Sequence, residues 1–162
     1  MATANKNLSD YDIKSIPDAS NMVFGIVVSE WNKDITFGLL NGAYQTLLDN
    51  GVEKNNIIVK SVPGAFELAF GAQTFFEKTK VDAVICLGSI IQGETKHFDF
   101  VCMGTTLGIK DVALKYNKPT IFGVLTDNTM QQAIDRSGGK LGNKGDEAAI
   151  TAIKMVAFQK EI

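Results

Sequence analysis

The sequence predicts an α/β domain of three layers, in which helices cover both faces of a four-stranded parallel sheet. Four short apolar runs predict the strands: residues 22–29 (MVFGIVVS), 57–61 (IIVKS), 83–89 (AVICLGS) and 120–125 (TIFGVL). Unbroken apolar runs of this length are typical of strands buried on both faces. The segments between them are long enough for crossover helices, and such alternation favours a parallel sheet of the flavodoxin-like, α/β/α type.

The first three helices follow from apolar spacing and from terminating residues. After the first strand, apolar side chains recur at intervals of three and four residues, and this helix ends at Gly51, a common C-terminal cap. Its apolar positions are Ile35, Leu39, Leu40, Ala43, Tyr44, Leu47 and Leu48. A second helix is predicted over residues 66–80, and a third from residue 97 or 99 to residue 117, ahead of Pro119.

The end of the chain predicts a short helix over residues 130–137, a glycine-rich connection and a closing helix over residues 146–159. The chain has 162 residues, 45% of them hydrophobic, which predicts one domain over residues 22–162. Residues 1–21 have no periodicity. They form either a disordered tail or an extension that docks on a neighbouring subunit through Leu8, Tyr11, Ile13 and Ile16.

Charge and composition argue against several classes of partner. A net charge of −2, from 16 basic and 18 acidic residues, gives no general attraction to nucleic acid or to an anionic membrane. No stretch approaches the roughly 18 consecutive apolar residues of a membrane span, and the start of the chain does not resemble a secretory signal. We therefore expect a soluble, cytoplasmic protein. Cys86 and Cys102 lie in apolar surroundings without metal-ligand spacing, so we expect reduced core thiols and no metal site.

Candidate functional residues follow the ends of the predicted strands, where parallel α/β sheets bind ligands. Trp31 follows the first strand, where its ring is suited either to stack on a planar ligand or to cover the core. Residues 93–95 precede a helix whose free N–H groups suit a phosphate. His97 is the only histidine and fits either proton transfer or a surface position at a helix start. Arg136, with Lys140 and Lys144, fits either a phosphate site or a solvated cluster of charges.

Several common nucleotide and phosphate sites are excluded by their missing motifs. The chain contains no G-x-x-x-x-G-K-[ST] motif, and no G-x-G-x-x-G motif follows the first strand. The third strand ends in Leu87-Gly88-Ser89, so it lacks the aspartate that a phosphoacceptor receiver domain needs at this point.

Five segments occur together in the order typical of one enzyme family. They are GIVVSEWN (residues 25–32), VPGAFE (62–67), GSIIQGETKHFDFV (88–101), IFGVLT (121–126) and AIDRSGGKLGNKG (133–145). From about residue 22 onward the chain resembles the 6,7-dimethyl-8-ribityllumazine synthases of riboflavin biosynthesis. The resemblance implies a transferase that condenses 5-amino-6-(D-ribitylamino)uracil with 3,4-dihydroxy-2-butanone 4-phosphate to give the lumazine, phosphate and water.

The resemblance also implies roles for individual residues. His97 matches the proton-transfer residue, and Trp31 matches the aromatic residue that stacks on the pyrimidine. Phe122 and Arg136 match residues supplied by the adjacent subunit. The implied pyrimidine- and ribityl-binding residues are Trp31, Ala65, Phe66, Glu67, Ser89, Ile90, Ile91, Phe122 and Lys144, and the implied phosphate-binding residues are Glu94, Thr95 and Arg136. Neither a metal nor a redox cofactor is implied, because two reactive substrates mainly need orientation and proton transfer.

Two residues depart from the pattern of many relatives, which have a basic residue at Gln92 and a different residue at Glu94. A carboxylate beside a phosphate is repulsive. Either Glu94 offers only its backbone N–H, or phosphate affinity is reduced.

A site shared between subunits implies a homo-oligomer. The resemblance implies a pentamer, and the compact connection over residues 138–145 favours the sixty-subunit icosahedral shell of some members, which encloses riboflavin synthase in some cases. Two other readings stay open: a binding module that has lost turnover, and a structural compartment for a partner enzyme.

Overall fold

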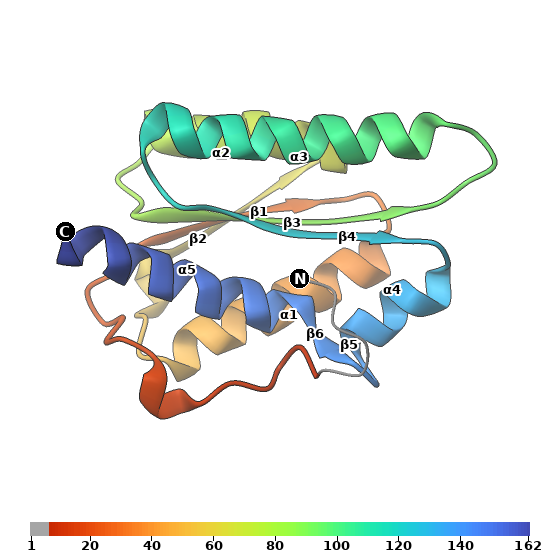
Figure 1. Cartoon of the computed structure of the whole chain (residues 1–162). Helices are drawn as coiled ribbons and strands as arrows, with labels where there is room; N and C mark the ends of the chain where they lie inside the picture. Colours follow the sequence, from red (N-terminus) through yellow and green to blue (C-terminus); the bar gives the residue numbers. More distant parts are fainter. Residues whose placement is uncertain (1–6) are drawn as a thin grey trace.

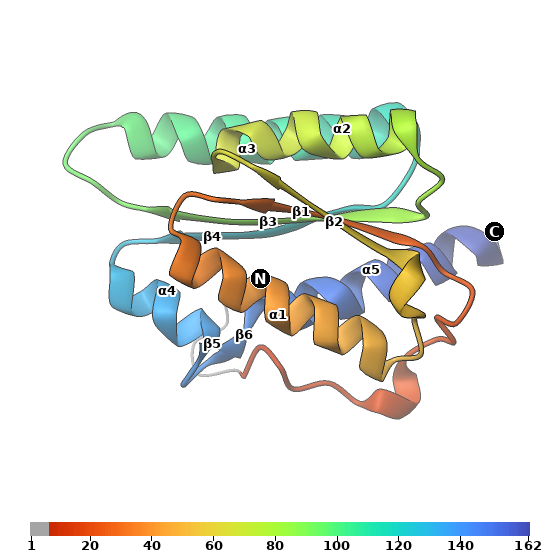
Figure 2. The ribbon, with the colours of Figure 1, turned by 180° about the vertical axis from the view of Figure 1, so that it is seen from behind.

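The computed structural model describes residues 7–162 as a three-layer α/β/α domain (Figure 1). Its central sheet is parallel and has the strand order β2-β1-β3-β4. Helices α2 and α3 cover one face, and α1, α4 and α5 cover the other, as the reverse view also shows (Figure 2). The predicted fold class is confirmed. The strands are β1 (Phe24–Ser29), β2 (Ile57–Val62), β3 (Ala83–Ile91) and β4 (Thr120–Asp127), and the helices are α1 (Lys33–Asp49), α2 (Leu68–Lys78), α3 (His97–Tyr116), α4 (Met130–Arg136) and α5 (Lys144–Glu161).

The two faces of the sheet bury separate apolar cores, which explains why the strands are apolar without alternation. Every residue of β1 is buried. Ile26 and Ile85 point toward the α1 and α5 side, while the adjacent Val27 and Cys86 point toward α2 and α3. Adjacent residues of a strand face opposite sides, so a central strand covered on both faces, such as β1, favours apolar residues at successive positions, whereas the edge strand β2 exposes Lys60 and Ser61.

The carboxyl ends of three strands extend further than the sequence predicted, β2 by one residue and β3 and β4 by two residues each. Strand β3 continues to Ile91 and β4 to Asp127, because these polar-flanked ends still pair with each other, with Ile91 opposite Asp127. The backbone N–H of Gln92 then donates to the carbonyl of Asp127 at 2.9 Å. Ile90 and Ile91 are therefore held in the sheet, where the prediction had them in a loop.

The prediction for the glycine-rich connection was incomplete. It contains a short antiparallel pair, β5 (Ser137–Gly139) and β6 (Gly142–Asn143), which is possible because Gly138 and Gly142 adopt positive φ angles of 114° and 81°. The closing helix α5 also starts earlier than expected, at Lys144, because the side chain of Asn143 caps it by accepting the N–H of Gly145 at 2.8 Å.

Residues 7–21 lie along the α1 and α5 side of the same chain (Figure 1). The N–H of Leu8 donates to the carbonyl of Leu141 at 2.8 Å, and the N–H of Asn143 donates to the Ser9 hydroxyl at 2.9 Å. Ala19 is fully buried in the core. The docking of residues 1–21 on a neighbouring subunit stays a prediction. Residues 1–6 of this segment lie outside the described part of the chain. Within residues 7–162, no helix has the length and apolar character to cross a membrane.

Candidate active site

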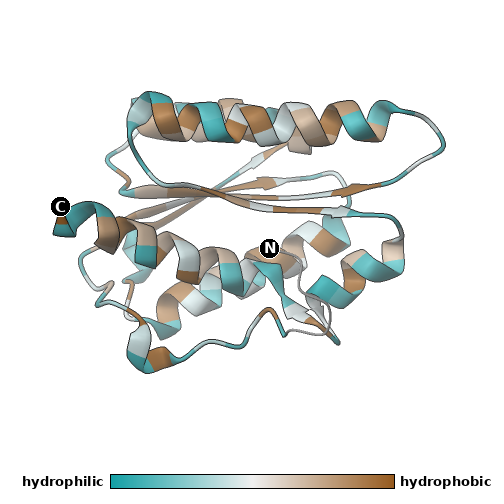
Figure 3. Cartoon of the chain, in the orientation of Figure 1, coloured by the Kyte–Doolittle hydropathy of each residue, from teal (hydrophilic) through white to brown (hydrophobic). Residues whose placement is uncertain are grey.

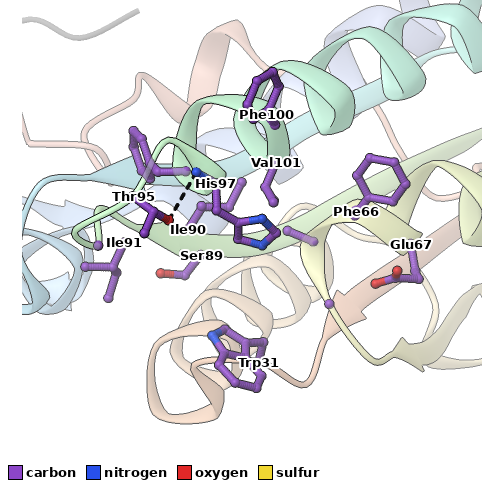
Figure 4. A pocket seen from close by; sticks show the side chains of 14 residues that line it. Trp31, Phe66, Glu67, Ser89, Ile90, Ile91, Thr95, His97, Phe100 and Val101 are labelled. Carbon is purple, nitrogen blue, oxygen red and sulfur yellow. Dashed lines mark hydrogen bonds between the residues drawn. The ribbon is translucent and has the colours of Figure 1, made fainter.

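A pocket of about 670 Å³ opens at the carboxyl ends of β1, β2 and β3, beneath the first turns of α3 (Figure 4). Most of the predicted site residues line it. Around one open space lie the indole of Trp31, the imidazole of His97 and the side chain of Glu67 (Figure 4). The predicted residues in its lining are Trp31, Ala65, Phe66, Glu67, Ser89, Ile90, Ile91, Thr95 and His97.

Trp31 is held at the pocket by the backbone around it. The N–H groups of Glu30 and Trp31 donate to the carbonyls of Val62 and Pro63, at 2.8 and 3.1 Å, so the loop after β1 is tied to the end of β2. Asn32 has a left-handed φ of 56°, and its side-chain amide donates to the Ser89 carbonyl at 3.0 Å. The indole itself is 71% exposed. In this chain the ring therefore faces the pocket and does not cover the core.

Phe66 and Glu67 belong to a short 3-10 helix, Ala65–Glu67, that leads into α2. Phe66 lies against α3 at Gly104, where a Cβ atom would come within 2.6 Å of the Phe66 ring. Glycine at this position lets the ring lie flat on the helix beside the pocket. The 3-10 turn thus places one aromatic ring and one carboxylate at the same wall of the pocket.

His97 is the first residue of α3 and is exposed toward the pocket (Figure 4). Its backbone N–H donates to the Thr95 hydroxyl at 3.3 Å, which orders the turn ahead of the helix. The N–H of Asp99 in this turn already donates to the carbonyl of Lys96 at 3.1 Å, so the N–H groups ahead of Asp99 are the ones that this helix start offers to an anion. A titratable imidazole and a set of anion-binding donors therefore lie side by side at one end of the pocket.

The floor of the pocket carries an unused polar group. The Ser89 hydroxyl is buried and, within residues 7–162, has no hydrogen-bond partner. Buried hydroxyls are nearly always paired in folded proteins, so an unpaired one beneath the pocket is unusual.

Four predicted site residues do not line this pocket. Glu94 is exposed in the loop before α3. Phe122 packs, partly buried, against the core under α2 and α3. Arg136, at the end of α4, forms an ion pair with Asp127 at 3.3 Å, and Lys144 forms one with Glu147 at 2.6 Å.

Four residues of the pocket were missed from the sequence, while Gly93 belongs to the predicted turn over residues 93–95: the missed residues are Gly64, Phe98, Phe100 and Val101. For two of them a signal existed. Phe100 and Val101 follow His97 by three and four residues, so a helix starting at His97 places all three on one face.

The two cysteines are free thiols that differ in burial. Cys86 is fully buried in β3, as predicted, and burial raises the pKa of its thiol to about 12. Cys102 is only partly buried, so the prediction of a core residue was wrong for it. Burial and the nearby Asp99 carboxylate raise the pKa of Cys102. Within residues 7–162, no group of three or more His, Cys, Asp and Glu side chains gathers as metal ligands would.

Comparison with known proteins agrees with the resemblance seen in the motifs. Residues 21–160 match the sequence profile of the 6,7-dimethyl-8-ribityllumazine synthase family. The chain is 60% identical to a 6,7-dimethyl-8-ribityllumazine synthase of Parabacteroides distasonis, over 98% of this chain and 99% of the relative. It is 57% identical to that of Phocaeicola vulgatus, over 100% of this chain and 96% of the relative. It is 60% identical to the 6,7-dimethyl-8-ribityllumazine synthase of Cytophaga hutchinsonii, over 97% of this chain and 98% of the relative. The chain therefore belongs to the 6,7-dimethyl-8-ribityllumazine synthase family, a family of transferase-type enzymes of riboflavin biosynthesis.

Proposed function

We propose that this protein condenses 5-amino-6-(D-ribitylamino)uracil with 3,4-dihydroxy-2-butanone 4-phosphate to form 6,7-dimethyl-8-ribityllumazine, phosphate and water. The observation that carries the proposal is the pocket in which Trp31, Glu67 and His97 surround one open space at the strand ends. A flat aromatic ring, a hydrogen-bonding carboxylate and a titratable imidazole are what this reaction requires. The family relationship supports the choice of substrates.

The pyrimidine stacks on Trp31, whose exposed indole offers an open face. Its ribityl chain and ring edge bind the turn at Ala65–Glu67 and the strand end at Ser89, Ile90 and Ile91.

The sugar phosphate binds ahead of α3. Thr95 and the free N–H groups of the first helical turn receive the phosphate, and Glu94 contributes its backbone rather than its carboxylate. The exposure of Glu94, outside the lining of the pocket, supports a side chain directed to solvent. His97 then lies beside the reacting carbons and moves protons during imine formation and loss of phosphate.

The site is completed by a neighbouring subunit in a pentamer. Phe122, Arg136 and Lys144 lie away from this chain's own pocket, so in this proposal they act in the pocket of the next subunit. Exposed apolar side chains support such an assembly: Phe70 and Leu114, on α2 and α3, are 74% and 73% exposed. Brown segments along these two helices in Figure 3 mark their apolar residues.

Twelve pentamers forming a sixty-subunit shell are the favoured assembly, because the connection between β5 and β6 is short. Analytical ultracentrifugation distinguishes the two assemblies, and a single pentameric species would contradict the shell. Enclosure of riboflavin synthase predicts that the two enzymes co-purify. The cytoplasmic location stays a prediction.

The proposal is tested by incubating the purified, chelator-treated protein with both substrates and following lumazine fluorescence together with released phosphate. Lumazine formed with equal phosphate supports the transferase. Tight binding of the pyrimidine without product would instead favour a binding module.

The role of His97 is tested by His97→Ala. We expect turnover to fall by about 10²–10⁴-fold, the usual contribution of a proton-transfer residue. Asp99→Asn is a matched control, because Asp99 is exposed in the same first turn of α3 but does not line the pocket. Undiminished turnover of His97→Ala would contradict the assignment.

A further inference from the structure

Arg136 is held by a buried carboxylate that no sequence motif indicated. Asp127 ends β4 and is only 7% exposed. Its Oδ1 atom lies 3.3 Å from the Nη1 atom of Arg136, whose side chain is 33% exposed. The backbone of Asp127 is itself fixed, because its carbonyl accepts the N–H of Gln92 at 2.9 Å at the end of the β3–β4 pair.

The guanidinium is anchored through one of its nitrogens. Nη1 donates to the carbonyl of Gln132 at 3.0 Å, one helical turn back in α4, and also pairs with Asp127. Within residues 7–162, neither Nε nor Nη2 of Arg136 donates a hydrogen bond to the protein. The Nε–Nη2 edge of a guanidinium is one of the edges that bind an oxyanion through two parallel N–H groups. The two contacts therefore leave a complete anion-binding edge free.

Arg136 is also the ionic partner of Asp127. The second carboxylate oxygen, Oδ2, is buried and has no hydrogen-bond partner within the described residues. Burial raises the pKa of Asp127, while the positive charge of Arg136 lowers it. The neighbouring carboxylate of Asp135 is engaged elsewhere, by Gln131 at 2.9 Å and by Lys140 at 3.0 Å.

We propose that Asp127 is a positioning residue for phosphate binding: it holds the Nη1 end of Arg136 so that the Nε–Nη2 edge faces the phosphate of the substrate. This inference rests on the proposed function, in which Arg136 binds that phosphate. A buried partner on a fixed strand restricts a flexible side chain before the ligand arrives, so less conformational entropy is lost on binding.

The experiment uses the assembled full-length protein and measures the KM of the sugar phosphate, the KM of the pyrimidine and the inhibition constant of inorganic phosphate. Asp127→Val removes the anchor but suits a buried β-strand, and Asp127→Asn removes the charge but keeps an acceptor oxygen. Asp135→Asn is the matched control, because it removes a nearby negative charge that does not pair with Arg136.

In Asp127→Val we expect the KM of the sugar phosphate and the inhibition constant of phosphate to rise about tenfold, near the upper end of the cost of ordering one flexible side chain on binding. The KM of the pyrimidine stays unchanged. Asp127→Asn and Asp135→Asn stay within about threefold of the parent protein, since each retains the anchor. The double variant Asp127→Val/Arg136→Ala binds the sugar phosphate and inorganic phosphate no more weakly than Arg136→Ala alone, because Asp127 acts through Arg136.

Three outcomes would overturn the inference. If Arg136→Ala weakens phosphate binding and Asp127→Val does not, Arg136 binds phosphate without help from Asp127. If Asp127→Val binds phosphate more tightly, or if Asp135→Asn has the same effect as Asp127→Val, charge and not orientation controls the site. If Arg136→Ala itself has no effect on phosphate, the proposed role of Arg136 fails, and the positioning role fails with it.

Discussion

Replacing Asn32 tests how the loop after β1 is held at the pocket. Asn32 has a φ of 56°, a region that asparagine tolerates better than alanine, and it donates to the Ser89 carbonyl at 3.0 Å. Losing the hydrogen bond costs about 1 kcal/mol. Forcing alanine into the left-handed region costs about 1 kcal/mol more. Asn32→Ala should therefore destabilise the protein by about 2 kcal/mol, and Asn32→Gly, which adopts this φ freely, by about 1 kcal/mol.

Urea unfolding at one fixed protein concentration measures both values, and calorimetry with an unreactive pyrimidine analogue reports on the pocket. We expect both variants to bind the analogue more weakly, because Trp31 is adjacent to the loosened residue. Equal destabilisation by Ala and Gly would show that the backbone conformation carries no cost. An unchanged free energy of unfolding in Asn32→Ala would refute the contribution of the hydrogen bond as well.

Three further predictions follow from burial and exposure. Trp31→Ala should weaken the binding of a pyrimidine analogue by about 1–3 kcal/mol, the usual loss of one stacking contact, as calorimetry would measure. Trp31→Phe should retain most of the affinity, and equal losses of affinity in the two variants would exclude stacking. Leu39→Ala, at a fully buried position of α1, should lower the free energy of unfolding by about 3 kcal/mol in urea, and a change below about 1 kcal/mol would contradict the core assignment. Because burial raises the pKa of Cys86 to about 12, its thiol should stay protonated at pH values well below 12 and should not react with iodoacetamide in the folded protein. Mass spectrometry should detect the alkylated Cys86 only after unfolding.

The sequence predicts the layers of this fold well, because each buried strand is visible as an apolar run within a few consecutive residues. A sheet buried on both faces needs unbroken apolar strands, and the run at residues 83–89 shows this directly. The ends of β3 and β4 were missed because their pairing depends on two strands that are distant in the chain. The β5–β6 pair was missed because glycine carries no strand preference, although it permits the positive φ at Gly138 and Gly142.

The candidate site shows the same division. Trp31, Thr95 and His97 were predicted at the ends of strands, and they line one pocket. The ion pair between Asp127 and Arg136 joins a strand end to a helix end, and no periodicity or motif indicates such a contact. Residues that act across a subunit boundary cannot be brought together by the folding of one chain.

The strand order β2-β1-β3-β4 also has a consequence for synthesis of the protein on the ribosome. Strand β1 is made first but forms the interior of the sheet together with β3, and both of its partners are translated later. No strand of this sheet pairs with its neighbour through a tight hairpin, so each pairing waits for an intervening helix. At about 5–20 residues per second, the β1 segment, which is fully buried in the folded protein, stays without its partners for seconds. The nascent chain therefore exposes an apolar strand before any of its partners has been made, which favours contact with chaperones during this interval.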